Sequence, residues 1–374
     1  MHRRRLLCSV AALGAFVLSA GASQAATGWT ASPATGVTGA ISSFSDTDAW
    51  ALGTNGSLGG AFAHWNGSTW TQVPGPSGLG FTQALSDDGP TDAWAVGLLV
   101  TGYASISPRI AHWNGSAWSV SGGAAVSGSV SVLEGVASLG PANAWAVGSD
   151  GQSALVEHWN GTAWTRVSVP DPSNGLGSFL TAVAATPSGD VWAVGGFDNP
   201  APQPESLYAL HYDGSAWHLV TMAQTGDPSA SDYPHAAQLV AVSTGDVWLV
   251  GTNGNSSSQT TLTEHWNGSA WSIVPSPFNQ VQSASGSTTF GTLLTVTAKA
   301  SNDVWAGGYS STLANGASSP VNHPLLIHWD GTSWTQDTSA PTTGAGSIAG
   351  ISTTLGGHVI WATNNGTPSL LEHP

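Results

Sequence analysis

Cysteine is almost absent from this chain of 374 residues, and basic residues are scarce. The one cysteine is Cys8, and 6 Lys and Arg residues stand against 21 Asp and Glu residues. With one cysteine the chain forms no internal disulfide, so its stability must come from packing and from the way its segments close on one another. So few basic residues cannot neutralise nucleic-acid phosphates or anionic lipid head groups. The composition therefore excludes nucleic acid and anionic membrane surfaces as partners.

Long apolar runs are also missing, apart from one at the N-terminus. Arg3–Arg5 precede the apolar stretch Leu6–Ala20, and Ser23–Ala25 supply a small-residue cleavage site. This order predicts a secretory signal peptide over residues 1–25, exported by either the general or the twin-arginine pathway. Its removal leaves three basic against 21 acidic residues, a formal charge of −18, and no cysteine. We expect a secreted, extracellular protein without membrane insertion, with one domain over residues 26–374.

Tryptophan and glycine are abundant, at 19 and 48 residues. Eighteen of the tryptophans fall in two phrases, Asp-x-Trp-Ala-x-Gly and His-Trp-Asn-Gly-x-x-Trp, which recur with small variations about every 50 residues. A period of this length indicates a repeat architecture. The first phrase surrounds Trp50, Trp94, Trp145, Trp192, Trp248, Trp305 and, in a degraded copy, Trp361, and the second begins at His64, His112, His158, His211, His265 and His328 and breaks off after His373.

Each repeat unit has the pattern of four short β-strands, and no segment has a helical pattern. Asn-Gly between alternating apolar residues predicts a tight hairpin of type I′ between the third and fourth strands, with positive φ at both central residues. Four antiparallel strands per unit favour the blade of a β-propeller over a sandwich. The sequence therefore predicts an all-β fold, a seven-bladed β-propeller of four-stranded blades.

The two ends of the chain complement each other. The last unit stops at Leu370–Pro374 after three strands, while Thr27–Pro33 has the pattern of a fourth strand and carries Trp29. We expect the N-terminal strand to complete the last blade and close the ring, which also removes open sheet edges.

The repeated side chains are interpreted as structural. Tryptophans at fixed strand positions fill the space between twisted blades, and the repeated His and Asp are expected to hydrogen-bond within each blade. Seven equivalent copies do not suit one active site, so no catalytic residue, no metal ligand and no cofactor is predicted. Ca²⁺ is the alternative for the acidic pairs Asp46/Asp48 and Asp87/Asp88, which we interpret as turn formers. The Asn-Gly-Ser/Thr sequons are likewise interpreted as turns.

The two phrases resemble those of secreted bacterial seven-bladed β-propeller proteins, related loosely to kelch-like and sialidase-like propellers. The resemblance implies the fold and an extracellular location, and little about activity. Sialidases hold their substrate with three arginines, whereas Arg109 and Arg166 are the only two beyond the signal peptide. Kelch-type copper oxidases need a cysteine. Both enzyme classes are therefore disfavoured.

Loops on a rigid scaffold carry function, and the two rims of the ring differ. The turns after the first and third strands form a repeated rim, while the loops after the second strand and between blades form a variable rim. Aromatic and polar residues on the variable rim suit a neutral glycan, bound by a monomer without catalysis. An extracellular protein partner is the alternative, and a glycan-cleaving enzyme that uses Glu134, facing the channel, with Asp198 or Asp232 is the third. The candidate ligand-binding residues are Tyr103, Arg109, Phe197, Asp198, Tyr233, His235 and His323.

Overall fold

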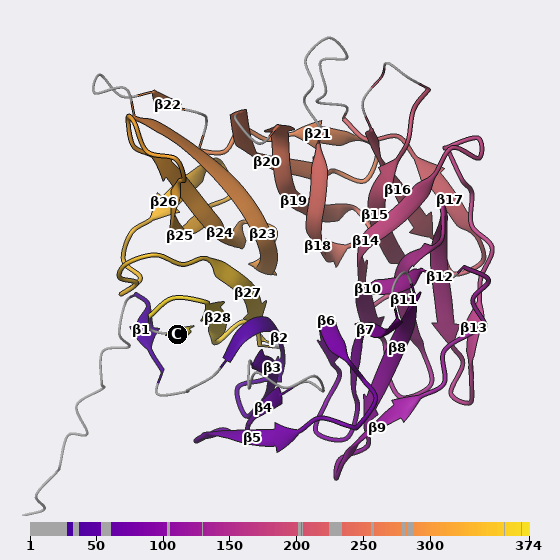
Figure 1. Cartoon of the computed structure of the whole chain (residues 1–374). Coiled ribbons are helices and arrows are strands. Elements are labelled where there is room, and N and C mark those ends of the chain that lie inside the picture. Colours follow the sequence, from indigo (N-terminus) through magenta and orange to yellow (C-terminus); the bar gives the residue numbers. More distant parts are fainter. Residues whose placement is uncertain are drawn as a thin grey trace, which may run out of the picture.

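Seven antiparallel sheets stand in a ring (Figure 1). Residues of the innermost strand of every sheet line a central channel. The computed structural model describes residues 28–32, 37–53, 61–102, 105–128, 130–200, 203, 205–223, 234–255, 258–278, 281–282, 287–354, 356–367 and 369–374, and every regular element within these ranges is a β-strand. The predicted seven-bladed, all-β propeller is confirmed. The predicted signal peptide lies outside the described residues.

The first three blades each have four strands, which run in chain order from the channel to the outside. Blade 1 contains β2 (Val37–Ser45), β3 (Asp48–Gly53), β4 (Ala61–Trp65) and β5 (Trp70–Pro74); blade 2 contains β6 (Phe81–Asp87), β7 (Ala93–Gly102), β8 (Ser105–Trp113) and β9 (Trp118–Ser121); blade 3 contains β10 (Ser131–Ser138), β11 (Ala144–Asp150), β12 (Ser153–Trp159) and β13 (Trp164–Arg166).

The next three blades repeat this plan, with one additional strand, β22, paired with the start of β23 in blade 6. Blade 4 contains β14 (Ser178–Ala185), β15 (Val191–Phe197), β16 (Ser206–Tyr212) and β17 (Trp217–Val220); blade 5 contains β18 (His235–Ser243), β19 (Asp246–Asn255), β20 (Ser258–Trp266) and β21 (Trp271–Ile273); blade 6 contains β22 (Val281–Gln282), β23 (Thr288–Ala300), β24 (Asp303–Leu313), β25 (Val321–Trp329) and β26 (Trp334–Asp337).

Blade 7 combines both ends of the chain. It contains β27 (Ile348–Thr353), β28 (Ile360–Asn364), β29 (Leu370–His373) and, as its fourth strand, β1 (Thr30–Ala31). Thr30 lies opposite Glu372 in the antiparallel pair, and the Ser32 amide donates to the Leu370 carbonyl at 3.0 Å. The predicted closure of the ring by the N-terminal strand is therefore confirmed.

A pair of tryptophans lies at every blade junction. The tryptophan of the second strand in one blade meets the tryptophan of the fourth strand in the next blade edge to face, with ring centroids 5.1–5.8 Å apart and planes at 80–89°. This geometry places the positive ring edge of one indole against the negative face of the other. The seven pairs are Trp50–Trp118, Trp94–Trp164, Trp145–Trp217, Trp192–Trp271, Trp248–Trp334, Trp305–Trp29 and Trp361–Trp70.

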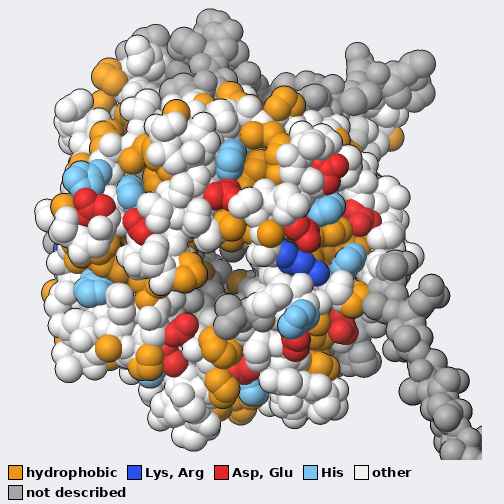
Figure 2. Space-filling model, turned by 180° about the vertical axis from the view of Figure 1, so that it is seen from behind, with side chains coloured by type: hydrophobic (Ala, Val, Ile, Leu, Met, Phe, Trp, Pro, Cys, Tyr) orange, Lys and Arg blue, Asp and Glu red, His pale blue; other side chains and the backbone are white. Residues whose placement is uncertain are grey.

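The repeated histidines hydrogen-bond within their own blades, as expected. His64 Nε2 lies 2.6 Å from Asp48 Oδ1, and the imidazole packs on Trp50 with ring centroids 4.4 Å apart. Equivalent pairs recur in blades 2 to 6, except that in blade 3 the partner of His158 is Asn143, at 2.9 Å. Histidine and acidic side chains accordingly lie side by side at many places on one face of the ring (Figure 2).

The hairpins between third and fourth strands differ from the expected type I′ turns. Trp65 pairs with Trp70, so the loop holds four residues, 66–69, and not two. Asn66 Oδ1 accepts the amides of Ser68 and Thr69 at 3.1 and 3.0 Å, which closes the turn through the side chain. Only the glycine has positive φ, between 89° and 92° in all six copies. The type I′ prediction was therefore wrong, because the loop holds four residues and only its glycine has positive φ.

Candidate functional site

Every innermost strand has a break in register at about the same height in the channel. In β10, Leu133 pairs with Gly148 and Gly135 with Val147, so Glu134 is an extra residue, a β-bulge. Corresponding shifts occur in β2, β6, β14, β18, β23 and β27. A bulge re-aims a side chain, and in blades 2 to 4 the bulged residues are Gln83, Glu134 and Thr181, all of which line the channel.

The bulge explains the glycine that ends the first repeated phrase. A Cβ at Gly148 would lie 2.0 Å from the Val132 carbonyl oxygen, a distance that no side chain tolerates. The same clash, at 1.9–2.0 Å from a first-strand carbonyl, would occur at the equivalent glycines of four other blades. The repeated glycine therefore permits the bulge that points side chains into the channel. The four other glycines are Gly97, Gly195, Gly251 and Gly308.

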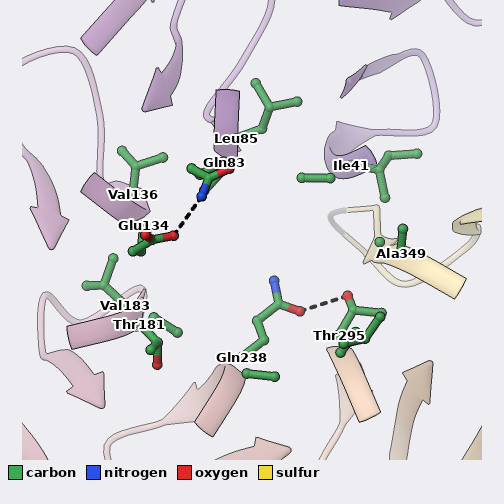
Figure 3. Close-up of a pocket in the computed structure, with 17 residues that line it drawn as sticks. Ile41, Gln83, Leu85, Glu134, Val136, Thr181, Val183, Gln238, Thr295 and Ala349 are labelled. Atoms are coloured by element: carbon green, nitrogen blue, oxygen red, sulfur yellow. Dashed lines mark hydrogen bonds between the residues drawn. The ribbon is translucent and has the colours of Figure 1, made fainter. Parts of the chain in front are cut away.

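The channel holds a cavity of about 150 Å³ with one polar side. Gln83 Nε2 donates to Glu134 Oε2 at 3.0 Å, and Gln238 Oε1 accepts the Thr295 hydroxyl at 2.8 Å and the Val296 amide at 2.7 Å (Figure 3). Because the oxygen of Gln238 is held in this way, its amide nitrogen points into the channel (Figure 3). The polar groups thus come from blades 2 to 6.

The opposite side of the cavity is apolar. Ile41 and Ala349 face the polar groups across the channel (Figure 3), and Ala40 and Leu294 also line it. Glu134 is the only carboxylate among the lining residues. The cavity therefore offers one negatively charged acceptor, amide donors and an apolar wall, a combination that binds and orients a small polar group.

The structure does not gather the residues predicted from the sequence into one pocket. Tyr103 and Tyr233 lie outside the described residues. Arg109 supports a loop, because its Nε donates to the Gly78 carbonyl at 3.1 Å. Phe197 is half-buried and packs edge to face on Tyr208, with ring centroids 6.0 Å apart, so its ring serves packing.

The remaining predicted residues lie on three blades. Asp198 follows β15 in blade 4, and together with burial its charge raises the pKa of Glu205 to about 7. His235 is exposed at the start of β18, and His323 Nδ1 lies 3.2 Å from the Gly344 carbonyl oxygen. None of the three predicted residues, Asp198, His235 and His323, lines the channel cavity.

Gln83 and Gln238 were not predicted from the sequence. A constant spacing could have revealed the first: Gln83, Glu134 and Thr181 each stand 11 residues before the tryptophan of the following strand. Gln238 stands one position later in its repeat, 10 residues before Trp248. Aligning the first strands on these tryptophans would have collected most of the polar side of the channel.

The acidic turn residues make internal contacts. Asp46 accepts the Thr354 hydroxyl at 2.6 Å and lies 2.9 Å from His358 Nδ1, while Asp87 accepts the amides of Phe44 and Gly89, each at 3.2 Å. Within the described ranges no group of three or more His, Cys, Asp or Glu side chains is arranged to hold a metal ion. No helix in the described part of the chain is long and apolar enough to cross a membrane.

Comparisons with known proteins identify the class of fold. No protein-family model and no curated protein matches the chain. Among solved structures it is similar to YCF48 from Cyanidioschyzon merolae, with TM-score 0.55 and 16% identity over 92% of this chain and 98% of that one. It is similar to YCF48 bound to D1 peptide, with TM-score 0.54 and 13% identity over 92% and 94% of the two chains. It is also similar to an ulvan lyase bound to -[GlcA(1-4)Rha3S]-, with TM-score 0.57 and 9% identity over 89% and 93%. These likenesses support a seven-bladed β-propeller.

Proposed function

We propose that this protein is an exported, non-catalytic recognition module that binds a neutral glycan through the polar side of its central channel. The observation that carries the proposal is the set of Glu134, Gln83 and Gln238 around one cavity. A carboxylate accepts hydrogen bonds from sugar hydroxyls, and an amide nitrogen donates to them. The apolar side of the cavity receives the C–H face of the same ring.

The net charge of the chain and the number of carboxyl groups in the cavity support binding without catalysis. A formal charge of −18 beyond the signal peptide repels anionic polysaccharides and leaves neutral ones as the favoured ligands. Glycoside hydrolysis requires two carboxyl groups about 5–10 Å apart, whereas Glu134 is the one carboxylate lining the cavity. Propellers of similar fold are described as bound to a carbohydrate and to a peptide, so a ring of this kind accommodates either class of ligand.

A glycan array with insoluble polysaccharides tests the proposal. The secreted wild-type protein is compared with Glu134→Gln and Gln238→Leu, which remove the channel acceptor and the channel donor. Glu372→Gln, in β29 away from the channel, is the matched control for loss of one charge. We expect selective binding of neutral glycans, lost in both channel variants and kept in the control. Binding that is absent, or unchanged in the channel variants, refutes the proposal.

A second candidate function is binding of a basic protein partner. Phe81, Leu98, Val100 and Ile106 pair across β6, β7 and β8 on one face of the blade 2 hairpin, where Phe81 and Val100 are each 50% exposed. An exposed apolar strip on an acidic protein suits a basic protein surface. This function predicts that capture of a basic extracellular protein fails with Val100→Lys and persists with Glu134→Gln.

A further inference from the structure

Two departures from the repeat meet at one blade junction. Asn143 in blade 3 stands where blades 1, 2, 4, 5 and 6 have aspartate, and Tyr212 in blade 4 stands where blades 1, 2, 3, 5 and 6 have tryptophan. Both residues line the same groove, on the repeated rim between blades 3 and 4. The groove has a volume of about 440 Å³, against about 150 Å³ for the channel cavity. The departures therefore coincide with an open site.

Elsewhere the equivalent tryptophan ties its strand to the turn of its own blade. Its indole Nε1 donates to the carbonyl two residues before the repeated Asp or Asn, at 2.8–3.2 Å in five blades. The Tyr212 ring packs on Trp145 with centroids 4.9 Å apart, much as the indoles do, but its hydroxyl donates to the Gly214 carbonyl at 3.1 Å. The corresponding carbonyl in blade 4, that of Ser188, therefore lacks the indole donor, and Ser188 lines the groove.

Because Asn143 replaces the aspartate of five other blades, the groove lacks that negative charge. Its Oδ1 lies 2.9 Å from His158 Nε2, and burial lowers the pKa of His158, so the imidazole is neutral at pH 7. Asp and Glu, like Lys and Arg, are absent from the residues that line this groove. Asn160 also lines the groove, and its Oδ1 accepts the amides of Thr162 and Ala163 at 3.0 and 3.1 Å, so Nδ2 is the donor that this side chain has left.

We propose that this groove binds one ring of a neutral sugar, as a second subsite apart from the channel. The Ser188 carbonyl accepts a sugar hydroxyl, and the Asn160 amide donates to another. The rings of Tyr212 and His158 supply the aromatic wall that packs against the C–H face of a sugar. This inference rests on the glycan-binding function proposed above and adds a site on the opposite side of blades 3 and 4 from the variable rim.

The test replaces Tyr212 with the tryptophan that the equivalent repeats carry at this position. Tyr212→Trp supplies the indole that five other blades carry, so the variant is expected to fold with a melting temperature no lower than that of wild type. The indole occupies the groove and donates to the Ser188 carbonyl. Saturation-transfer NMR and calorimetry use the methyl glycosides of glucose, galactose, mannose and N-acetylglucosamine as probes. His218→Gln, an exposed position on the outer strand of blade 4, is the matched control.

We expect at least one glycoside to bind wild type and His218→Gln equally, and to bind Tyr212→Trp about tenfold or more weakly, the loss of one good contact. Binding lost in Glu134→Gln but kept in Tyr212→Trp would place the sugar in the channel alone and overturn the groove, while the proposed function stands. If glycoside binding is unchanged in both Glu134→Gln and Tyr212→Trp, the channel site and the groove site are both overturned. Absence of saturation transfer from all four glycosides to wild type overturns the groove.

Discussion

Trp29, in the first described segment of the chain, packs edge to face on Trp305 of blade 6, with ring centroids 5.5 Å apart and planes at 80°. Six other junctions have the same pair, and of these Trp361–Trp70 also joins an early residue to the late part of the chain. Both indoles are buried. The closure of the ring therefore depends on a short strand, β1, and on one large side chain that anchors it.

Trp29→Ala is expected to destabilise the protein by about 3–5 kcal/mol, the usual loss for a buried tryptophan. It is also expected to free β1, which has only two residues in register with β29. Trp118→Ala is the matched control, because Trp118 makes the same contact with Trp50 within a continuous part of the chain. Chemical denaturation measures the loss in both variants, and limited proteolysis near Thr30 measures fraying. Equal proteolysis of the two variants contradicts the special role of Trp29.

The sequence predicted the architecture because the architecture is repeated. Period, four-strand pattern, tryptophan packing, His–Asp pairing and ring closure all follow from features present in many copies, and the structure confirms each of them. The site was harder to predict because its residues differ from one repeat to the next. Gln83 and Gln238 carry no motif, and the bulge that aims Gln83 into the channel is visible only once the strands are paired. Phe197 was wrongly predicted to bind ligand because it is an aromatic residue next to Asp198. In the structure its ring packs on Tyr208.

Asn143→Asp is expected to raise the pKa of His158. Burial now lowers that pKa without a carboxylate partner, and an aspartate at the same position would favour the charged imidazole. NMR titration of the His158 ring protons measures the shift. His373 in blade 7, whose pKa burial also lowers, is the internal reference and should keep its pKa. A His158 titration that does not move upward contradicts the assigned pairing.

Two glycines with the same backbone conformation allow the cost of a positive φ to be measured apart from the cost of a clash between the new Cβ and its neighbours. Gly67 and Gly214 have φ of 90° and 91° in equivalent hairpins. A Cβ at Gly67 would lie 2.8 Å from Thr47 Cγ2, whereas one at Gly214 would meet nothing within 4 Å. Gly214→Ala is therefore expected to lower the free energy of unfolding by about 1–2 kcal/mol, the cost of left-handed backbone. Gly67→Ala should lower it further. Equal losses in urea denaturation would show that the contact with Thr47 relaxes freely.

Asp87 makes stability depend on pH. Burial, followed by the nearby Asp48 charge, raises the pKa of Asp87 from its ordinary 3.8 to about 8. The folded protein keeps this proton up to about pH 8, while the unfolded chain releases it near pH 4, so the folded state binds more protons between these values. The stabilisation is complete below pH 4, declines as pH rises and is lost above pH 8. Burial also raises the pKa of Glu264 to about 7, which adds to the decline.

Melting temperatures at pH 5, 7 and 9 should therefore fall in that order for wild type, and Asp87→Asn should flatten the decline without abolishing it. The amide carries no charge at any of these pH values, so the variant should gain most over wild type at pH 9. Asp213→Asn is the control, because the pKa of that exposed carboxyl is lowered by the Ser215 hydroxyl and by turn amides, and the group stays ionised throughout the range. An unchanged pH dependence in Asp87→Asn would mean that Asp87 is ionised in the folded protein, its charge held by the Phe44 and Gly89 amides.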